Sequence, residues 1–133
     1  MEKLKKAFVE KSALEVVSIL YEVANDNKAE DMVLLDVKKI SGFADYFLIM
    51  NGRSTRHVQG LAGALEQKLS RKRLSSSKAE GLDEGHWVLL DFNDVIVHIF
   101  YHEERQVFDL EGLWHDAPRV DLTKLGKPEE VPQ

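Results

Sequence analysis

The chain has 133 residues, no cysteine, 44% hydrophobic residues and a formal net charge of −5. This length fits one soluble domain, and the missing cysteines exclude disulfides, thiolate metal sites and thiol nucleophiles. The acidic balance disfavours a nucleic-acid binder and suits a basic partner surface. No apolar run reaches the ~18 residues of a membrane span, and no signal peptide is recognisable, so we expect a cytoplasmic protein.

The elements alternate between helical and strand patterns. They are predicted in chain order as a helix over 12–24, strands over 32–37 and 46–50, a helix from 54 or 55 to 73, a weak strand reaching 80–81, strands over 87–91 and 95–100, and a turn followed by a short helix within 102–114. Ser12 and Glu15 form a capping box for the first helix. Gly60 and Gly63 weaken the second helix, and we expect close packing against the sheet to explain them.

This order predicts an α/β (α+β) fold with a mixed sheet of four to five strands and helices mainly on one face. We expect residues 1–11 to be an N-terminal extension and residues 12–118 to form one domain. Residues 119–133 are predicted to be a poorly ordered C-terminal tail, because the chain from Asp116 onward holds all three prolines and has no apolar periodicity.

The hairpin of the strands over 87–91 and 95–100 carries the most informative pattern. Successive strand residues point to opposite faces, and a two-residue loop of Phe92 and Asn93 would place Trp87 opposite His98. One face is uniformly aliphatic and is predicted to pack against the helices; it holds Val88, Leu90, Val95, Val97 and Ile99. The other face mixes apolar and polar groups; it holds Trp87, Leu89, Asp91, Asp94, Ile96, His98 and Phe100. Two interpretations of this second face stay open: burial under a helix or the C-terminal segment, and exposure to a partner.

Patterns that would carry catalysis or bind a metal are weak. The 5 histidines lack the spacing of a zinc-binding helix, and Asp91 and Asp94 suit a turn better than a metal site. Gly52-Arg53-Ser54 resembles a turn of nucleotidyltransferases, but its single glycine and missing lysine favour a helix cap at Ser54. We therefore predict no enzyme, no cofactor and no metal, with a nucleotidyltransferase-like nucleotide-binding enzyme as the alternative function.

Two long segments carry a family resemblance. ADYFLIMNGRSTRHVQGLAGALEQKL and WVLLDFNDVIVHIFYHEERQVFDLEGLW resemble the ribosomal silencing factor family, also called Iojap-like proteins, within a match over about 12–118. The motifs D-Y-F, G-x-S-x-R-H-V, W-V-L-L-D, D-V-I-V-H and D-L-E-x-L-W occur in order at family spacing, which short isolated motifs do not achieve. The resemblance implies a nucleotidyltransferase-like fold without known transferase activity.

The resemblance also implies a partner and a mechanism. Such proteins bind the fourteenth ribosomal protein of the large subunit and sterically block the small subunit, which represses translation when nutrients are limiting. Matched by residue, the partner-binding surface falls on the second hairpin face, and the flanking positions are Arg56, His57, Arg105, Glu111 and Trp114. For Arg56 and His57, a solvated first helical turn is the alternative. Family members often form homodimers, which would compete for the same face, and we expect little direct nucleic-acid contact.

Overall fold

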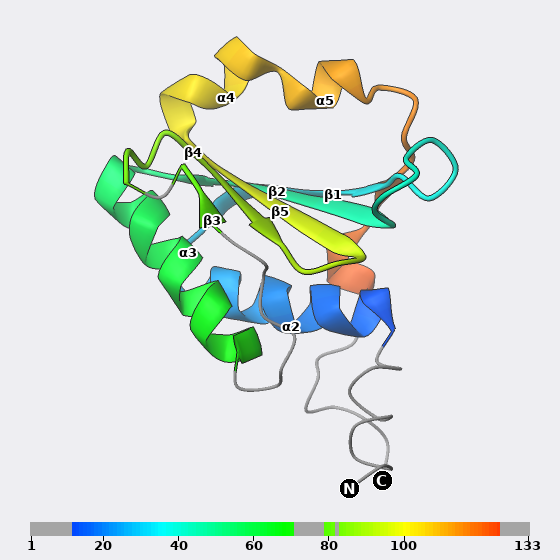
Figure 1. Ribbon diagram of the computed structural model, residues 1–133, viewed down its shortest axis with the longest axis horizontal. Coiled ribbons are helices and arrows are strands. Elements are labelled where there is room, and N and C mark those ends of the chain that lie inside the picture. The colour runs from blue at the N-terminus through cyan, green and yellow to red at the C-terminus, as the bar shows by residue number, and fades with distance from the viewer. Residues whose placement is uncertain (1–11, 71–78, 82, 126–133) are drawn as a thin grey trace, which may run out of the picture.

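The structure, a computed structural model, describes residues 12–70, 79–81 and 83–125. A mixed six-stranded sheet in the order β3-β4-β5-β2-β1-β6 forms its centre (Figure 1). The strands are β1 (Glu30–Asp36), β2 (Tyr46–Gly52), β3 (Ala79–Glu80), β4 (Trp87–Asp91), β5 (Val95–Tyr101) and β6 (Arg119–Val120). The helices are α2 (Ala13–Asp26), α3 (Thr55–Ser70), α4 (His102–Phe108), α5 (Leu110–Leu113) and the 3-10 helix η1 (Leu122–Lys124). β2 and β5 are parallel, and the other neighbouring strands are antiparallel.

The helices lie on both sides of the sheet. The long helices α2 and α3 share one side, and the short helices α4 and α5 cross the other (Figure 1). We call these two sides the α2–α3 face and the α4–α5 face. The predicted mixed sheet with its helices mainly on one face is confirmed, because both long helices share a side. The sheet is wider than the four to five strands predicted, because the two-residue strands β3 and β6 extend its edges.

The α2–α3 face is sealed by apolar side chains. Helix α2 begins with the predicted capping box, in which Glu15 N donates to Ser12 Oγ at 3.1 Å and Ser12 N donates to Glu15 Oε1 at 2.9 Å. Helix α3 turns a stripe of side chains toward the sheet, each at most 1% exposed: Val58, Leu61, Ala62, Leu65 and Leu69. Burying one leucine fully stabilises a fold by roughly 1.5–3 kcal/mol, so this layer contributes strongly to folding.

The prediction that Gly60 and Gly63 pack closely against the sheet is wrong. Both are exposed, and a Cβ at either position would meet nothing within 4 Å, because they fall between the buried positions of the stripe. The close approach occurs instead where α3 begins. A Cβ at Gly52 would lie 2.8 Å from Val58 Cγ2, and Gly85, at φ +72°, would bring one within 2.7 Å of the Thr55 carbonyl oxygen.

The β4–β5 hairpin turns one residue later than predicted. Phe92 N donates to the Val95 carbonyl at 2.9 Å, so the loop residues are Asn93 and Asp94. Asn93 has a φ of +74°, and its N–H donates to Asp91 Oδ1 at 2.9 Å. Asparagine tolerates this left-handed backbone far better than phenylalanine does, which explains the position of the turn.

The later turn changes the pairing but not the faces. Trp87 lies opposite Phe100, not opposite His98. Because the shift in pairing is two residues, every side chain keeps its predicted side of the sheet. The predicted aliphatic set does pack with α2 and α3 in one core cluster: Val88, Leu90, Val95, Val97 and Ile99.

The chain after residue 118 is ordered over its first residues, in contrast to the predicted tail over 119–133. Val120 pairs with Leu34 at the edge of β1, and Leu122, only 8% exposed, joins the core of the α2–α3 face. Strand pairing and this one buried leucine hold the segment in place. Residues 126–133 and the predicted N-terminal extension over 1–11 lie outside the described residues.

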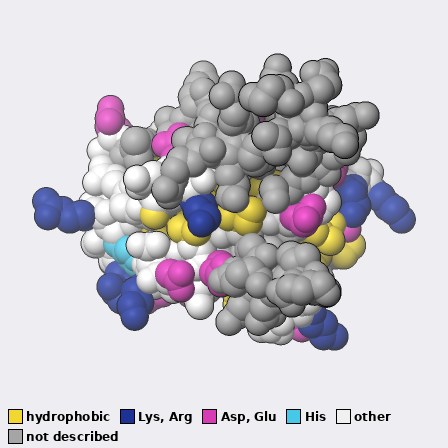
Figure 2. Space-filling view, turned by 90° about the horizontal axis from the view of Figure 1, so that it is seen from below, with side chains coloured by type: hydrophobic (Ala, Val, Ile, Leu, Met, Phe, Trp, Pro, Cys, Tyr) yellow, Lys and Arg dark blue, Asp and Glu magenta, His cyan; other side chains and the backbone are white. Residues whose placement is uncertain are grey.

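The surface on the α2–α3 side carries charges of both signs. Seen from below in Figure 2, lysine and arginine side chains project at the periphery, and acidic side chains are scattered among them. The side chains visible in this view therefore form no single-sign patch of the kind that steers nucleic acid. Within the described part of the chain, no helix is long and apolar enough to cross a membrane.

Candidate functional site

Helices α4 and α5 form the outer layer of the candidate site. The sequence predicted a turn and then one short helix over 102–114, whereas the structure has a helix on each side of Asp109. Asp109 has a φ of +47°, and its carboxylate caps α5 by accepting a hydrogen bond from Gly112 N at 3.2 Å. Aspartate tolerates this backbone and favours caps, so it ends one helix and begins the next.

Arg105 fastens α4 to the sheet and to α5. It is only 8% exposed, and its Nε and Nη2 donate to the Glu111 carboxylate at 3.0 and 2.9 Å. Its Nη1 donates to Asn51 Oδ1 at 2.9 Å and to the Asp31 carbonyl at 2.6 Å. The Arg105 guanidinium lowers the pKa of Glu111, mainly through these hydrogen bonds. Arg105 and Glu111, predicted as flanking contact residues, are therefore engaged with each other.

Three of the seven predicted partner-binding residues are buried beneath these helices. Ile96 is 6% exposed, His98 is 4% exposed and Phe100 is fully buried. A partner cannot reach them while α4 and α5 cover β5. For these three residues, burial under a helix is the correct interpretation, and an exposed patch is not.

Strand β4 is covered only in part, since Phe108 of α4 lies against Trp87. Three of its side chains reach the surface on the α4–α5 face and are half-buried: Trp87, Leu89 and Asp91. Asp94, in the adjoining turn, is exposed. We call these four residues the β4 strip; they are the part of the predicted site that a partner can touch in this structure.

Trp87 is held in its orientation by His98. Trp87 Nε1 donates to His98 Nδ1 at 3.2 Å, which leaves the proton of the neutral imidazole on Nε2. Burial lowers the pKa of His98 to about 4, and His98 Nε2 has no hydrogen-bond partner among the described residues. The ring of Phe47 lies edge-on to this imidazole, with the ring centres 5.0 Å apart. His98 is therefore a neutral, buried support for the indole.

The start of α3 uses its polar groups internally. His57 N donates to Ser54 Oγ at 3.0 Å, so the predicted helix cap at Ser54 is confirmed. His57 Nδ1 accepts from Arg53 N at 3.0 Å, and its Nε2 lies 2.8 Å from the Asn27 carbonyl, which ties α3 to the end of α2. The amides of Arg53 and His57 are thus engaged by side chains of the same turn, which fits the cap predicted at Ser54. Arg56 is exposed.

Three apolar side chains that the short helices add to the surface were not predicted from the sequence. Val107 is 74% exposed, Leu113 is 75% exposed and Phe108 is 41% exposed. Phe108 contacts Trp87, with ring centres 4.7 Å apart, and Trp114 is half-buried against Phe47 at 4.9 Å. The segment 107–114 contains more apolar residues than the buried sides of two short helices can take up. This excess could have predicted that some of them are exposed.

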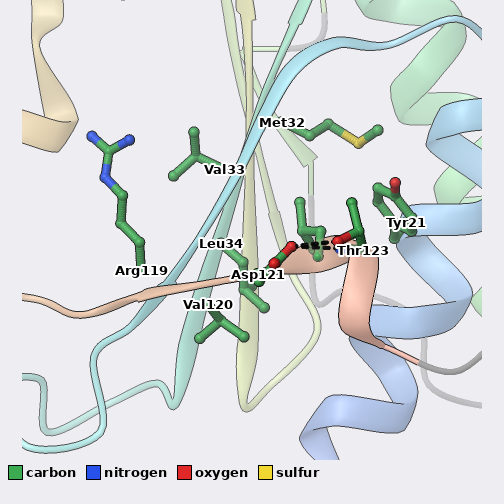
Figure 3. A pocket seen from close by; sticks show the side chains of 9 residues that line it. Tyr21, Met32, Val33, Leu34, Arg119, Val120, Asp121 and Thr123 are labelled. Carbon is green, nitrogen blue, oxygen red and sulfur yellow. Dashed lines mark hydrogen bonds between the residues drawn. The ribbon is translucent and has the colours of Figure 1, made fainter.

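A hollow at the edge of β1 is a weaker candidate. Figure 3 shows Met32 and Tyr21 on one side of the sheet edge and Val33 on the other, with a hydrogen bond between Asp121 and Thr123. That carboxylate caps η1, accepting from Thr123 N at 3.0 Å and Thr123 Oγ1 at 2.6 Å. The hollow thus lacks the converging free polar groups of a ligand site. Within 12–70, 79–81 and 83–125, no group of three or more His, Cys, Asp or Glu could hold a metal ion.

The fold and the site together define a small α/β protein with a partly aromatic, half-exposed strip on one face of its sheet. The family model described as "Ribosomal silencing factor during starvation" matches residues 10–133. The chain is 42% identical over 107 residues to the ribosomal silencing factor RsfS of Bacillus subtilis strain 168, covering 80% of this chain and 91% of that protein. The chain belongs to the ribosomal silencing factor family.

More distant relatives share this fold or parts of this sequence. A crystal structure of a protein from Chromobacterium violaceum superposes with a TM-score of 0.77 at 28% identity, covering 90% of this chain and 100% of that one. A mouse protein named "Mitochondrial assembly of ribosomal large subunit protein 1" is 29% identical over 101 residues, covering 74% of this chain and 44% of that protein. The resemblance seen in the sequence is therefore confirmed at the level of the family.

Proposed function

We propose that this chain binds the large ribosomal subunit through its fourteenth ribosomal protein and blocks joining of the small subunit. Translation would be repressed in this way when nutrients are limiting. Membership of the ribosomal silencing factor family supports the proposal, and the name of the mouse relative refers to the ribosomal large subunit. The observation that carries it is the β4 strip, a half-exposed strand face with an oriented aromatic side chain at one end and acidic groups at the other.

The chemistry of the strip suits a basic ribosomal protein. Tryptophan is among the residues that contribute most at protein interfaces, and Trp87 is already fixed by His98, so little side-chain entropy is lost on binding. Asp91 and Asp94 add negative charge that attracts a basic surface and repels RNA phosphates. We assign direct contact to the β4 strip, and supporting roles beneath it to the buried residues Ile96, His98 and Phe100.

Steric blocking needs no catalytic group. A factor that occupies the docking site of the small subunit acts through its bulk and its affinity, and it turns over no substrate. The proposal therefore requires neither a cofactor nor a metal ion.

Co-sedimentation with isolated ribosomal subunits tests the proposal. We expect the wild type to sediment with large subunits and not with small ones, and to reduce the ribosome peak when both subunits are mixed on a sucrose gradient. Trp87→Ala should weaken binding about thirtyfold, as a hot-spot residue does. Leu14→Ala is the matched control, since Leu14 is 38% exposed on α2 at the opposite side of the sheet.

Three results would each count against a different part of the proposal. A wild-type chain that stays in the supernatant with large subunits would overturn ribosome binding itself. A chain that binds large subunits while ribosomes still form normally would overturn only the steric block. Retained binding by a folded Trp87→Ala variant would remove the β4 strip from the contact surface. Binding to the purified fourteenth ribosomal protein alone would test the named partner.

A further inference from the structure

Helices α4 and α5 expose a ridge of apolar side chains beside the β4 strip. We call Val107, Phe108 and Leu113 the α4–α5 ridge; they are 74%, 41% and 75% exposed. Among the described residues, the other large hydrophobic side chains that are exposed belong to α2 and to the loop after β1: Leu14, Ile40 and Phe43. The ridge therefore concentrates apolar surface on two short helices that lie outermost on this side of the molecule (Figure 1).

Two of the three ridge residues, Val107 and Leu113, do not serve the packing of the helices that carry them, whereas Phe108 lies against the rings of Trp87 and Phe100. Arg105 on α4 and Leu110 on α5 make the buried contacts, at 8% and 7% exposure. Val107 and Leu113 point away from that interface, since three quarters of each side chain meets solvent. Two aliphatic side chains that stay this exposed, next to an aromatic ring that contacts the β4 strip, are typical of a surface that binds a partner.

The charge around the ridge selects the kind of partner. Residues 102–116 contain five acidic residues and one arginine, a net charge of −4 with neutral histidines. Glu103, Asp109 and Asp116 are exposed. A polyanion such as RNA would be repelled, and a second copy would bring the same negative charge against itself. A basic protein surface fits both the apolar ridge and its acidic border.

We propose that the α4–α5 ridge is a second docking element, which extends the β4 strip and binds a basic protein surface on the large ribosomal subunit. This inference rests on the proposed function. Phe108 joins the two elements, because its ring contacts Trp87 with the ring centres 4.7 Å apart. The bound protein thus meets one continuous surface, with aromatic anchors in the strip and aliphatic side chains on the ridge.

A double variant tests the ridge without disturbing the fold. Val107→Ser with Leu113→Ser removes apolar surface that is already exposed, so the melting temperature should stay within about 5 °C of the wild type. Affinity for purified large subunits should fall at least about tenfold, because side chains that desolvate on binding carry much of its energy. Leu14→Ser is the matched control and should bind like the wild type.

Charge reversal tests the class of partner through the sign of its effect. Glu103→Lys with Asp116→Lys should weaken binding to large subunits, and more strongly at low salt, if the ridge meets a basic protein. The same change would strengthen binding if the ridge met ribosomal RNA, which would overturn the proposed partner. Asp26→Lys, an exposed acid at the end of α2, controls for net charge.

The remaining outcomes separate this inference from the proposed function. If the wild type fails to bind large subunits, the proposed function falls and the ridge falls with it. If the wild type binds and the double serine variant binds equally well, only the ridge is overturned. Light scattering adds the last outcome: a wild-type dimer that the serine variant abolishes, with ribosome binding unchanged, would assign the ridge to a second copy of this chain.

Discussion

The two faces of the sheet are built from different chemistry. On the α2–α3 face, β4 and β5 contribute only aliphatic side chains between Trp87 and Phe100, apart from Phe92 at the turn, and all are at most 5% exposed. On the α4–α5 face, aromatic rings, a buried histidine and a buried arginine share the layer. Two long helices close the first face, whereas two short helices cover only part of the second and leave β4 half-exposed.

This difference suggests that the α2–α3 face serves the stability of the fold and that the α4–α5 face serves the proposed binding. Aliphatic burial is non-directional and scales with area, so the α2–α3 face can hold the fold without specifying any orientation. Hydrogen bonds and aromatic contacts depend on direction, and on the α4–α5 face they orient Trp87 and anchor α4. Changes on the first face should therefore alter stability alone, and changes on the second should alter binding as well.

The largest effect on stability is expected from Leu65→Ala. Leu65 is fully buried on α3, and its truncation leaves a cavity, so the free energy of unfolding should fall by about 2–5 kcal/mol. Urea denaturation measures the loss. The affinity of the folded fraction for large subunits should be unchanged, and a parallel loss of affinity would contradict the separation of the two faces. Leu14→Ala, at an exposed position of α2, should cost far less.

Arg105→Met is expected to lower the free energy of unfolding by about 2–3 kcal/mol, because the Asn51 and Glu111 oxygens lose their donor in a partly buried place. The pKa of Glu111 is lower in the folded chain than in the unfolded chain. The contribution of Glu111 to the free energy of unfolding is therefore fully present above the unfolded pKa, and it is lost as the pH falls through the folded pKa. Acid unfolding of the wild type should therefore be steeper near pH 4 than that of the variant. Binding should weaken too, because α4 loses its hydrogen bonds to the sheet. Unchanged binding would show that the Arg105 hydrogen bonds do not support the proposed docking surface.

The buried His98 should make the free energy of unfolding depend on pH in a less acidic range than Glu111 does. Burial lowers the pKa of His98 from 6.5 to about 4. Between these two pH values the imidazole is protonated in the unfolded chain and neutral in the folded chain. The free energy of unfolding should fall by about 2 kcal/mol between pH 7 and pH 5. His98→Asn, which keeps an acceptor near Trp87 but does not titrate, should flatten this profile and preserve binding. His98→Leu should flatten it equally and weaken binding; equal affinities of the two variants would show that Trp87 needs no acceptor.

The smallest effect is a gain of stability. Gly60→Ala and Gly63→Ala should each stabilise the chain by about 0.5–1 kcal/mol, because both positions are helical and exposed, and the added methyl group meets nothing. Thermal unfolding measures the gain, with unchanged binding. Gly52→Ala supplies the contrast, since its Cβ would clash with Val58 and should destabilise the chain. If Gly60→Ala or Gly63→Ala lowered the stability, that glycine would have a packing role, which would contradict this prediction.

Local periodicity was sufficient to predict most of the fold. The capping box at Ser12 and the bounds of β4 follow from short-range patterns, and the structure agrees with both. The two hairpin faces were also predicted correctly, although the turn lies one residue later, because side-chain direction depends only on parity.

What the sequence could not supply depends on contacts between distant segments. Whether the second hairpin face is covered depends on where 102–114 docks, and Arg105 fixes that through Asn51, a partner 54 positions away. The burial of His98 follows from that docking and leaves no local pattern. Likewise β6 forms only because β1 offers an open edge far along the chain.

The most direct test of the central claim uses the absence of cysteine from the chain. A single cysteine can be placed at Val107 on the α4–α5 ridge or at Leu14 on α2, both exposed positions. Labelling with a maleimide is then followed with and without saturating large ribosomal subunits. If the α4–α5 ridge docks on the ribosome, large subunits should slow labelling at position 107 at least about tenfold and leave position 14 unaffected. Protection at position 14 with free reaction at position 107 would contradict this prediction, because the opposite face would then be the one that docks.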